Sequence, residues 1–246
     1  MNTLILCIYG RAGYECLNYL LLKEFFNYTE IIIFTHTKNN DLLLDFIKNM
    51  NFNFYTTSIN NCENILNGKK GLLLSIHYRN IIKENIINCF DGMKINLHPS
   101  LLPYYKGCFS SVWALINNEK ETGITYHILT SDVDKGNILI QEKINICEND
   151  TAFSLFHKLI TLSINKLPKL FELIKYQYQG EKQIGSGSYY KREVPYNGII
   201  NNEWSEKQKE LFARAMYFPP HPGATLIKGE NYITINSISE LYENII

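Results

Sequence analysis

The chain has 246 residues, of which 46% are hydrophobic, so it can bury the core of one large α/β domain with a small appendage, or of two small domains. Its 24 basic and 24 acidic residues cancel, which excludes the strong positive charge that holds most nucleic-acid-binding proteins on phosphates. It has no C-x-x-C pair, so we expect no metal site. It has no run of about 20 apolar residues and no basic leader, so we expect a cytoplasmic protein without a membrane partner, and its neutral charge predicts no nucleic-acid partner.

Short apolar runs and stretches of helical spacing alternate up to residue 98. The runs that we predict as strands are short and rich in β-branched or aromatic residues: Leu4–Tyr9, Ile31–Thr35, Phe52–Thr57, Leu72–Ile76 and Lys94–Leu97. The helices predicted between them are Tyr14–Phe26, Leu42–Met50, Asn60–Asn67 and Asn80–Phe90. This alternation predicts a Rossmann-like α/β fold, in which a mainly parallel sheet has helices on both faces.

The pattern changes after residue 98, where the prolines at 99 and 103 exclude regular structure throughout. A helix is predicted at Phe109–Ile116. Two runs that alternate in polarity, Gly123–Leu129 and Ile138–Ile146, predict strands that pair around the turn between them.

A long amphipathic helix is predicted from Asp150 to about Tyr178, with a kink at Pro168. The glycine- and serine-rich segment Gly185–Ser188 then resembles a hinge between domains. We therefore predict an α/β domain at 1–182 and a small α+β unit, with one helix and a short hairpin, at 183–246.

The densest chemical signal is the segment Ile95–Gly107, which reads INLHPSLLPYYKG. Side chains alternate along a strand, so Asn96 and His98 point the same way, and Pro99 ends the strand. This places an amide and an imidazole together at the carboxyl end of a sheet strand, where open α/β sheets bind ligands. The amide can donate to a developing oxyanion and the imidazole can move a proton, which favours acyl transfer.

The second signal is the turn Leu129–Leu139, which reads LTSDVDKGNIL. It carries two aspartates, Asp132 and Asp134, between the two predicted strands. One of them could orient or polarise a histidine.

These two blocks resemble the formyltransferases that use N10-formyltetrahydrofolate, which act on glycinamide ribonucleotide, methionyl-tRNA or nucleotide-linked amino sugars. The shared pattern is N-x-H-P-S-L-L-P from Asn96, then Gly107, then D-x-G-x-I from Asp134. The resemblance implies the formyltransferase fold, with Asn96, His98 and Asp134 as the catalytic residues and no covalent enzyme intermediate. Asp132 then has the alternative role of capping the turn.

The resemblance also implies where the donor binds. Folate sites in this family use backbone from the loop after the fourth strand and from the aspartate turn, and the residues that match here are Tyr78, Asn80, Ile82, Thr130 and Asp132. The alternative is that Tyr78 and Arg79 belong to an ordinary loop.

For the acceptor, the candidates are Arg11, Tyr105 and Lys106. Arg11 follows Gly10 at the start of the first helix, in a corner that faces the acceptor in the resembling enzymes, and it could contact phosphate. The alternative for Arg11 is an exposed surface arginine. Trp113 borders the same region, but its neighbours favour core packing.

Length and the C-terminal segments favour the nucleotide-sugar branch, because members of that branch share the Ser188–Arg192 segment and the Phe218–Ala224 element. The expected acceptor is a dTDP-linked 4-amino-4,6-dideoxyhexose, with a 3-amino isomer next, and the implied role is lipopolysaccharide O-antigen synthesis. A methionyl-tRNA or glycinamide ribonucleotide enzyme, and an inactive folate- or nucleotide-binding regulator, remain alternatives. We also expect a homodimer, because the small apolar tail needs a surface to bury against.

Overall fold

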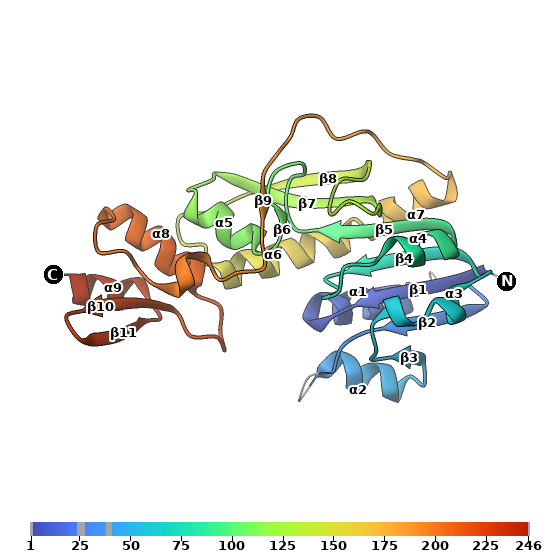
Figure 1. The fold of residues 1–246 in the computed structure, drawn as a ribbon, viewed down its shortest axis with the longest axis horizontal. Helices are drawn as coiled ribbons and strands as arrows, with labels where there is room; N and C mark the ends of the chain where they lie inside the picture. The colour runs from blue at the N-terminus through green and yellow to red at the C-terminus, as the bar shows by residue number, and fades with distance from the viewer. Residues whose placement is uncertain (1, 24–27, 38–40, 246) are drawn as a thin grey trace. The chain divides into compact units, whose positions relative to one another are not determined.

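A computed structural model describes residues 2–23, 28–37 and 41–245 (Figure 1). Its main element is a sheet of seven strands in the order β3-β2-β1-β4-β5-β7-β8. In chain order these strands are β1 (Asn2–Ile8), β2 (Glu30–Phe34), β3 (Asn53–Tyr55), β4 (Lys70–Ile76), β5 (Asp91–His98), β7 (Glu121–Ile128) and β8 (Ile138–Asn145). The first five pair in parallel and β7 pairs antiparallel with β5, so the predicted mainly parallel sheet is confirmed.

Helices connect the strands. They are α1 (Gly10–Leu22), α2 (Leu42–Asn49), α3 (Glu63–Leu66), α4 (Glu84–Cys89), α6 (Ala152–Asn165) and α7 (Leu167–Lys175), with a short 3-10 helix, η1, at Ile59–Asn61. The first helix begins earlier than predicted, and residues 24–26 of that prediction lie outside the described residues. The long helix predicted to residue 178 is broken at Lys166, and Pro168 lies in the first turn of α7, where its missing N–H costs no hydrogen bond within the helix.

The helix predicted at 80–90 begins only at Glu84. The side chain of Asn60 explains the delay, because its Nδ2 donates to the carbonyl of Ile81 at 2.8 Å and its Oδ1 accepts from the amide of Lys83 at 2.9 Å. These two bonds hold the residues after β4 in an irregular loop.

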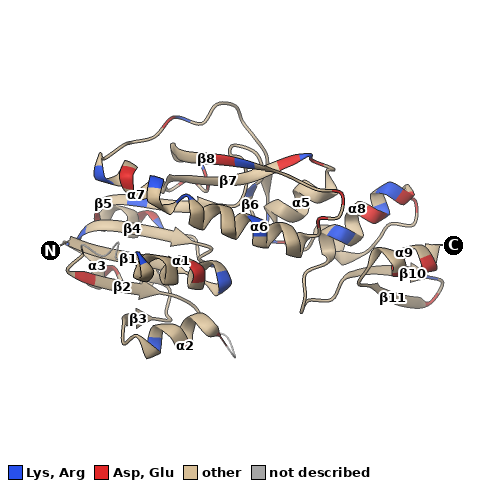
Figure 2. Cartoon of the chain, turned by 180° about the vertical axis from the view of Figure 1, so that it is seen from behind, with Lys and Arg blue, Asp and Glu red and all other residues tan. Residues whose placement is uncertain are grey.

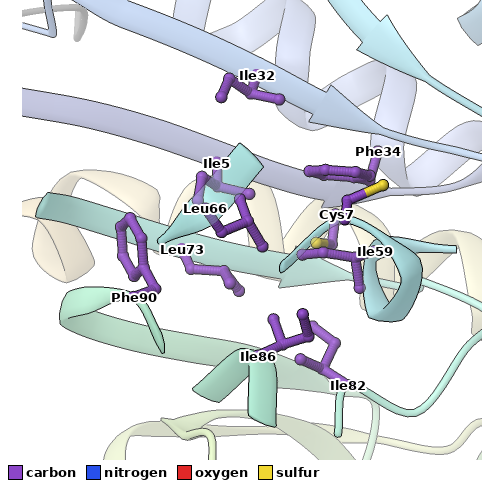
Figure 3. Packing of buried hydrophobic residues seen from close by; sticks show 11 residues of the cluster. Ile5, Cys7, Ile32, Phe34, Ile59, Leu66, Leu73, Ile82, Ile86 and Phe90 are labelled. Atoms are coloured by element: carbon purple, nitrogen blue, oxygen red, sulfur yellow. The ribbon is translucent and has the colours of Figure 1, made fainter. Parts of the chain in front are cut away.

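The chain divides into two compact units, which consist of residues 1–98, 125–141 and 162–184, and of residues 99–124, 142–161 and 185–246. In the first unit, one face of the sheet packs on η1, α3 and α4 through Ile5, Leu73, Leu66 and Ile86 (Figure 3). The alternate residues of β1 and β4 are also fully buried. The central strands are therefore covered on both faces, as their unbroken apolar sequences predict.

The second unit contains α5 (Ser110–Ile116), α8 (Glu206–Met216), α9 (Ile238–Ile245), a 3-10 helix, η2 (Pro195–Gly198), the hairpin β10 (Ala224–Lys228) and β11 (Asn231–Ile235), and the short pair β6 (Lys106–Gly107) and β9 (Tyr189–Tyr190). Ser205 and Gln208 form a capping box that starts α8. Phe212, Leu226 and Leu241 form the centre of a small core between α8, the hairpin and α9. None of the helices in the described part of the chain has the length and apolarity of a membrane span.

Candidate active site

The end of β5 carries the amide and imidazole side chains that the sequence predicts to lie together. Asn96 and His98 are two residues apart on the strand, and their partners on β7 are His127 and Thr125. His98 is only 4% exposed, whereas Asn96 is half-buried. Because β5 ends at His98, both side chains lie at the carboxyl edge of the parallel strands, which is the ligand-binding edge of such sheets.

Asp134 comes to these residues from the turn between β7 and β8. Its backbone is left-handed, with φ of +54°, and only 9% of the residue is exposed. The turn is tight at Gly136, where a β-carbon would lie 1.7 Å from the carbonyl oxygen of Ile128. In this position Oδ2 of Asp134 lies 3.4 Å from Nδ1 of His98. The structure therefore brings together the three residues that the sequence predicts as catalytic.

A second histidine, His127, completes the cluster and was not predicted. Its Nε2 lies 3.1 Å from Nδ2 of Asn96 and 3.5 Å from Oδ1 of Asp134, and its Nδ1 lies 2.9 Å from the carbonyl oxygen of Ile128. A carbonyl can only accept, so the neutral ring carries its proton on Nδ1 and its Nε2 accepts from Asn96. One hydrogen of the Asn96 amide is thereby engaged, and the second is left to donate to a reacting oxygen.

The signal for His127 was present in the sequence but incomplete. Alternation along the predicted strand at 123–129 places Thr125 and His127 on one face. Which residue of β5 lies opposite depends on the register of the pair, and a change of one residue would turn His127 away from Asn96.

A third histidine, His77, follows β4 with φ of +55°. Removal from water, and to a smaller extent the positive charge that His98 can carry, lower the pKa of His77 to about 4. The His77 ring is therefore neutral near pH 7, which limits the positive charge beside His98.

The predicted folate residues lie in two places. In the loop after β4, the Tyr78 hydroxyl accepts from the amide of Ile59 at 3.1 Å, and the side chain of Ile82 lies in the apolar core, so a ligand contact of Ile82 would use its backbone. In the aspartate turn, Thr130 Oγ1 donates to the carbonyl of Asp132 at 3.0 Å, and the Asp132 carboxylate forms an exposed ion pair with Lys135. Asn80 is half-buried beside Tyr78, whose hydroxyl it contacts.

The predicted acceptor residues differ in their surroundings. Arg11 is exposed and its Nε lies 3.5 Å from Glu15, one turn along α1. Tyr105, at φ of +59°, donates its hydroxyl to Glu119 at 2.6 Å and stacks on Tyr190 with ring centroids 5.6 Å apart.

Lys106 is only 7% exposed, and its ammonium donates to the carbonyl of Ser186 at 2.8 Å. This bond connects β6, which contains Lys106, to the segment before β9. Trp113 stacks on Tyr190 with ring centroids 4.5 Å apart, in keeping with the packing role predicted for it.

Arg79 is a further cation that sequence reasoning did not place in the site. Its guanidinium lies 5.2 Å from the ring centroid of Tyr9, with Nη1 at 3.4 Å from the Tyr9 hydroxyl, and its amide donates to Nε2 of His36. Tyr9 and Arg79 follow β1 and β4, which are neighbours in the sheet although β2 and β3 come between them in the chain. This is the point where the strand order reverses, and such points are preferred ligand sites.

Charge in the rest of the molecule is mixed. Figure 2 shows basic and acidic positions interspersed over the elements. Among the described residues, no group of His, Cys, Asp and Glu side chains could hold a metal ion. The polar side chains that the site brings together are an amide, imidazoles and one carboxylate.

The known proteins to which the chain is similar are formyltransferases. Residues 59–170 match a family model described as formyl transferase. Over 209 residues the chain is 39% identical to GDP-perosamine N-formyltransferase of Brucella melitensis biotype 1, which covers 82% of this chain and 81% of that protein. It is also similar to the solved structure of WlaRD, a sugar 3N-formyltransferase crystallised with dTDP and 5-N-formyl-THF, with 27% identity and a TM-score of 0.76 over 89% of this chain and 80% of that one. An N-formyltransferase from Helicobacter canadensis in complex with folinic acid and dTDP-3-aminofucose has 25% identity and a TM-score of 0.77, covering 95% of this chain and 86% of that one.

Proposed function

The chain belongs to the formyl transferase family, and on that premise we propose that it moves a formyl group from N10-formyltetrahydrofolate to the amine of a GDP-linked amino sugar. The observation that carries the proposal is the cluster of Asn96, His98, His127 and Asp134 at the carboxyl edge of the sheet. Such a cluster offers an amide donor, a proton carrier and an orienting carboxylate, which are the groups that acyl transfer to an amine requires.

The formyl donor supplies an activated carbonyl carbon, and the site fits it because Asn96 retains an N–H after bonding to His127. Asn96 donates this N–H to the formyl oxygen as negative charge develops there. Asp134 orients His98 through Nδ1, so Nε2 is the ring nitrogen that moves the proton. The amine nitrogen forms the new bond to the formyl carbon as the bond to N10 breaks, and the proton lost by the amine is returned to N10.

The GDP-linked acceptor takes precedence over the dTDP-linked sugar that the sequence favours, because the relative at 39% identity is named for a GDP sugar and is the more similar protein. The two solved structures, at 27% and 25% identity, were determined with dTDP or a dTDP sugar. We propose a 4-amino-4,6-dideoxyhexose as the sugar, and lipopolysaccharide O-antigen synthesis in the cytoplasm as the context.

For the diphosphate, Arg79 and Arg11 are the proposed contacts. Both lie beside the end of β1, Arg11 at the start of α1 and Arg79 against Tyr9. Two guanidinium groups at the point where the strand order reverses suit a diphosphate, since arginine binds phosphate oxygens in a bidentate manner. Lys106, which is engaged by Ser186, is a weaker candidate than Arg79.

We also propose a homodimer. The second unit exposes Tyr232 on the hairpin and Tyr242 on α9, and its apolar core is small. Light scattering of the purified chain tests the proposed homodimer. A monomer at the assay concentration would refute the homodimer without affecting the proposed chemistry.

The experiment for the activity is a coupled assay with N10-formyltetrahydrofolate and a panel of GDP-, dTDP- and UDP-linked amino sugars, with mass spectrometry of the products. The expected result is the highest kcat/KM with a GDP-linked 4-amino sugar. A matched His98→Gln preparation controls for contaminating enzymes. Faster formylation of initiator tRNA or of glycinamide ribonucleotide than of any sugar nucleotide would overturn the proposed acceptor.

A further inference from the structure

The segment 179–183, which follows α7, runs along the turn that carries Asp134. Glu181 and Ile138 exchange two backbone hydrogen bonds, of 2.8 and 2.9 Å, and Asn137 Nδ2 donates to the carbonyl of Gln179 at 3.0 Å. Gly180 makes the close approach possible, because φ is +73° and a β-carbon there would lie 2.6 Å from the carbonyl oxygen of Ile138. The segment and the start of β8 are therefore joined backbone to backbone.

Gln183 extends this contact from the backbone to the turn itself. Its Nε2 donates to the carbonyl oxygen of Asp134 at 2.8 Å and to that of Gly136 at 2.9 Å. Both hydrogens of one amide nitrogen are thus bound by the turn. Gln183 is half-buried, so water competes only in part for these bonds.

The position of the turn matters because two contacts of the Asp134 carboxylate with histidine rings are long. Its oxygens lie 3.4 Å from His98 Nδ1 and 3.5 Å from His127 Nε2, whereas a charge-assisted hydrogen bond is about 2.7–2.9 Å. Catalytic hydrogen bonds of an unliganded site often shorten when the substrate binds, so a small displacement of the turn decides whether they form.

We propose that Gln183 is a positioning residue for catalysis, which holds the Asp134 turn at the distance from which the carboxylate can orient His98. This inference rests on the proposed role of Asp134. The turn has other anchors, since the amide of Ile128 donates to the carbonyl of Asn137 at 2.9 Å and Glu181 pairs with Ile138. Loss of the Gln183 amide would therefore leave the fold in place and release the backbone at Asp134.

The test compares two variants with a matched control. Gln183→Met removes the donors and the polarity, while Gln183→Glu keeps the shape and removes the donors at neutral pH. The control is Gln179→Met, the same chemical change in the same segment, because the Gln179 side chain donates to the carbonyl of Gln177 and its backbone bond to Asn137 is retained.

Two measurements separate positioning from stability and from the choice of acceptor. Steady-state kinetics should show kcat lowered by roughly 10- to 100-fold in both Gln183 variants, since a misplacement of about 1 Å can cost two orders of magnitude, with KM for both substrates within about threefold of wild type. Nitrogen NMR of the labelled histidine rings, without substrate, should show a changed signal for Nδ1 of His98, which is assigned by its loss in His98→Gln.

The outcomes are distinct. A lower kcat with a moved His98 signal and an unaffected Gln179→Met supports the proposal. Wild-type kcat in Gln183→Met, a lower kcat with an unmoved His98 signal, or equal effects in Gln179→Met overturns it. Gln183→Glu decides in the same way if Gln183→Met does not fold. Because the NMR signal needs no acceptor, it stays informative if the proposed acceptor is wrong.

Discussion

His127 gives the sharpest prediction, because the shortest contact at each ring nitrogen is defined: the Asn96 amide lies 3.1 Å from Nε2 and the Ile128 carbonyl 2.9 Å from Nδ1, while the Asp134 carboxylate lies farther from Nε2, at 3.5 Å. In His127→Phe an aromatic ring is kept, while the acceptor for Asn96 Nδ2 at 3.1 Å and the donor to the Ile128 carbonyl at 2.9 Å are both lost. If His127 acts by orienting the Asn96 amide, removing His127 cannot lower kcat by more than removing that amide does.

The size of the effect follows from this limit. Removing an oxyanion donor outright lowers turnover by roughly 10²–10³, so His127→Phe should lower kcat by no more than that and leave KM for the donor nearly unchanged. The lost bond to the Ile128 carbonyl should lower the free energy of unfolding by ~1 kcal/mol, because His127 is buried. Urea unfolding of the same preparations measures this stability term separately from turnover.

The double variant tests the coupling. The variant that combines Asn96→Ala with His127→Phe should have the same kcat as Asn96→Ala alone. Once the Asn96 amide is absent, His127 has no amide left to orient. His127→Gln, which can still accept from Asn96, should recover part of the loss. Multiplicative effects of the two changes would refute the argument that His127 works through Asn96.

The remaining predictions concern the other residues of the site. Asn96→Ala should lower kcat by roughly 10²–10³, and His98→Ala by roughly 10²–10⁴, in the coupled assay, and near-normal turnover in either variant would remove that residue from the mechanism. Arg79→Ala should raise KM for the sugar nucleotide by roughly 10-fold and leave KM for the folate nearly unchanged, because a hydrogen bond to a charged group is worth ~1.5 kcal/mol. Arg11→Ala should raise KM for the sugar nucleotide less, because Arg11 also pairs with Glu15. His77 should make the fold sensitive to acid: its pKa of about 4 lies below the ordinary 6.5, so the unfolded chain binds the proton more readily and stability should fall as the pH drops from 6.5 towards 4. Urea unfolding of wild type and His77→Phe at several pH values checks this, and an equal acid loss in both would contradict it.

The fold was predictable where local periodicity is strong. The apolar runs of the central strands are buried on both faces, so their composition alone indicates parallel strands between helices, and Asn96 and His98 share a face because the period of a strand is two. The boundaries were less predictable. The late start of α4 involves the side chain of Asn60, 24 residues upstream of Glu84, a contact that the sequence of residues 80–83 does not reveal.

The site shows the same limit more clearly. Three of its residues come from local motifs, but His127 reaches Asn96 only through the register of β5 and β7, and Gln183 reaches the turn across 49 residues of chain. Lys106 was an acceptor candidate because of its proximity to His98 in sequence, and the structure adds that its ammonium donates to the carbonyl of Ser186, 80 residues away. In each case the deciding partner is distant in sequence, and a backbone carbonyl or a neutral amide carries no signature that a single sequence could reveal. The residues that hold the Asp134 turn and the Asn96 amide in place are therefore the ones for which the structure, and the variants proposed above, add most to what the motif predicts.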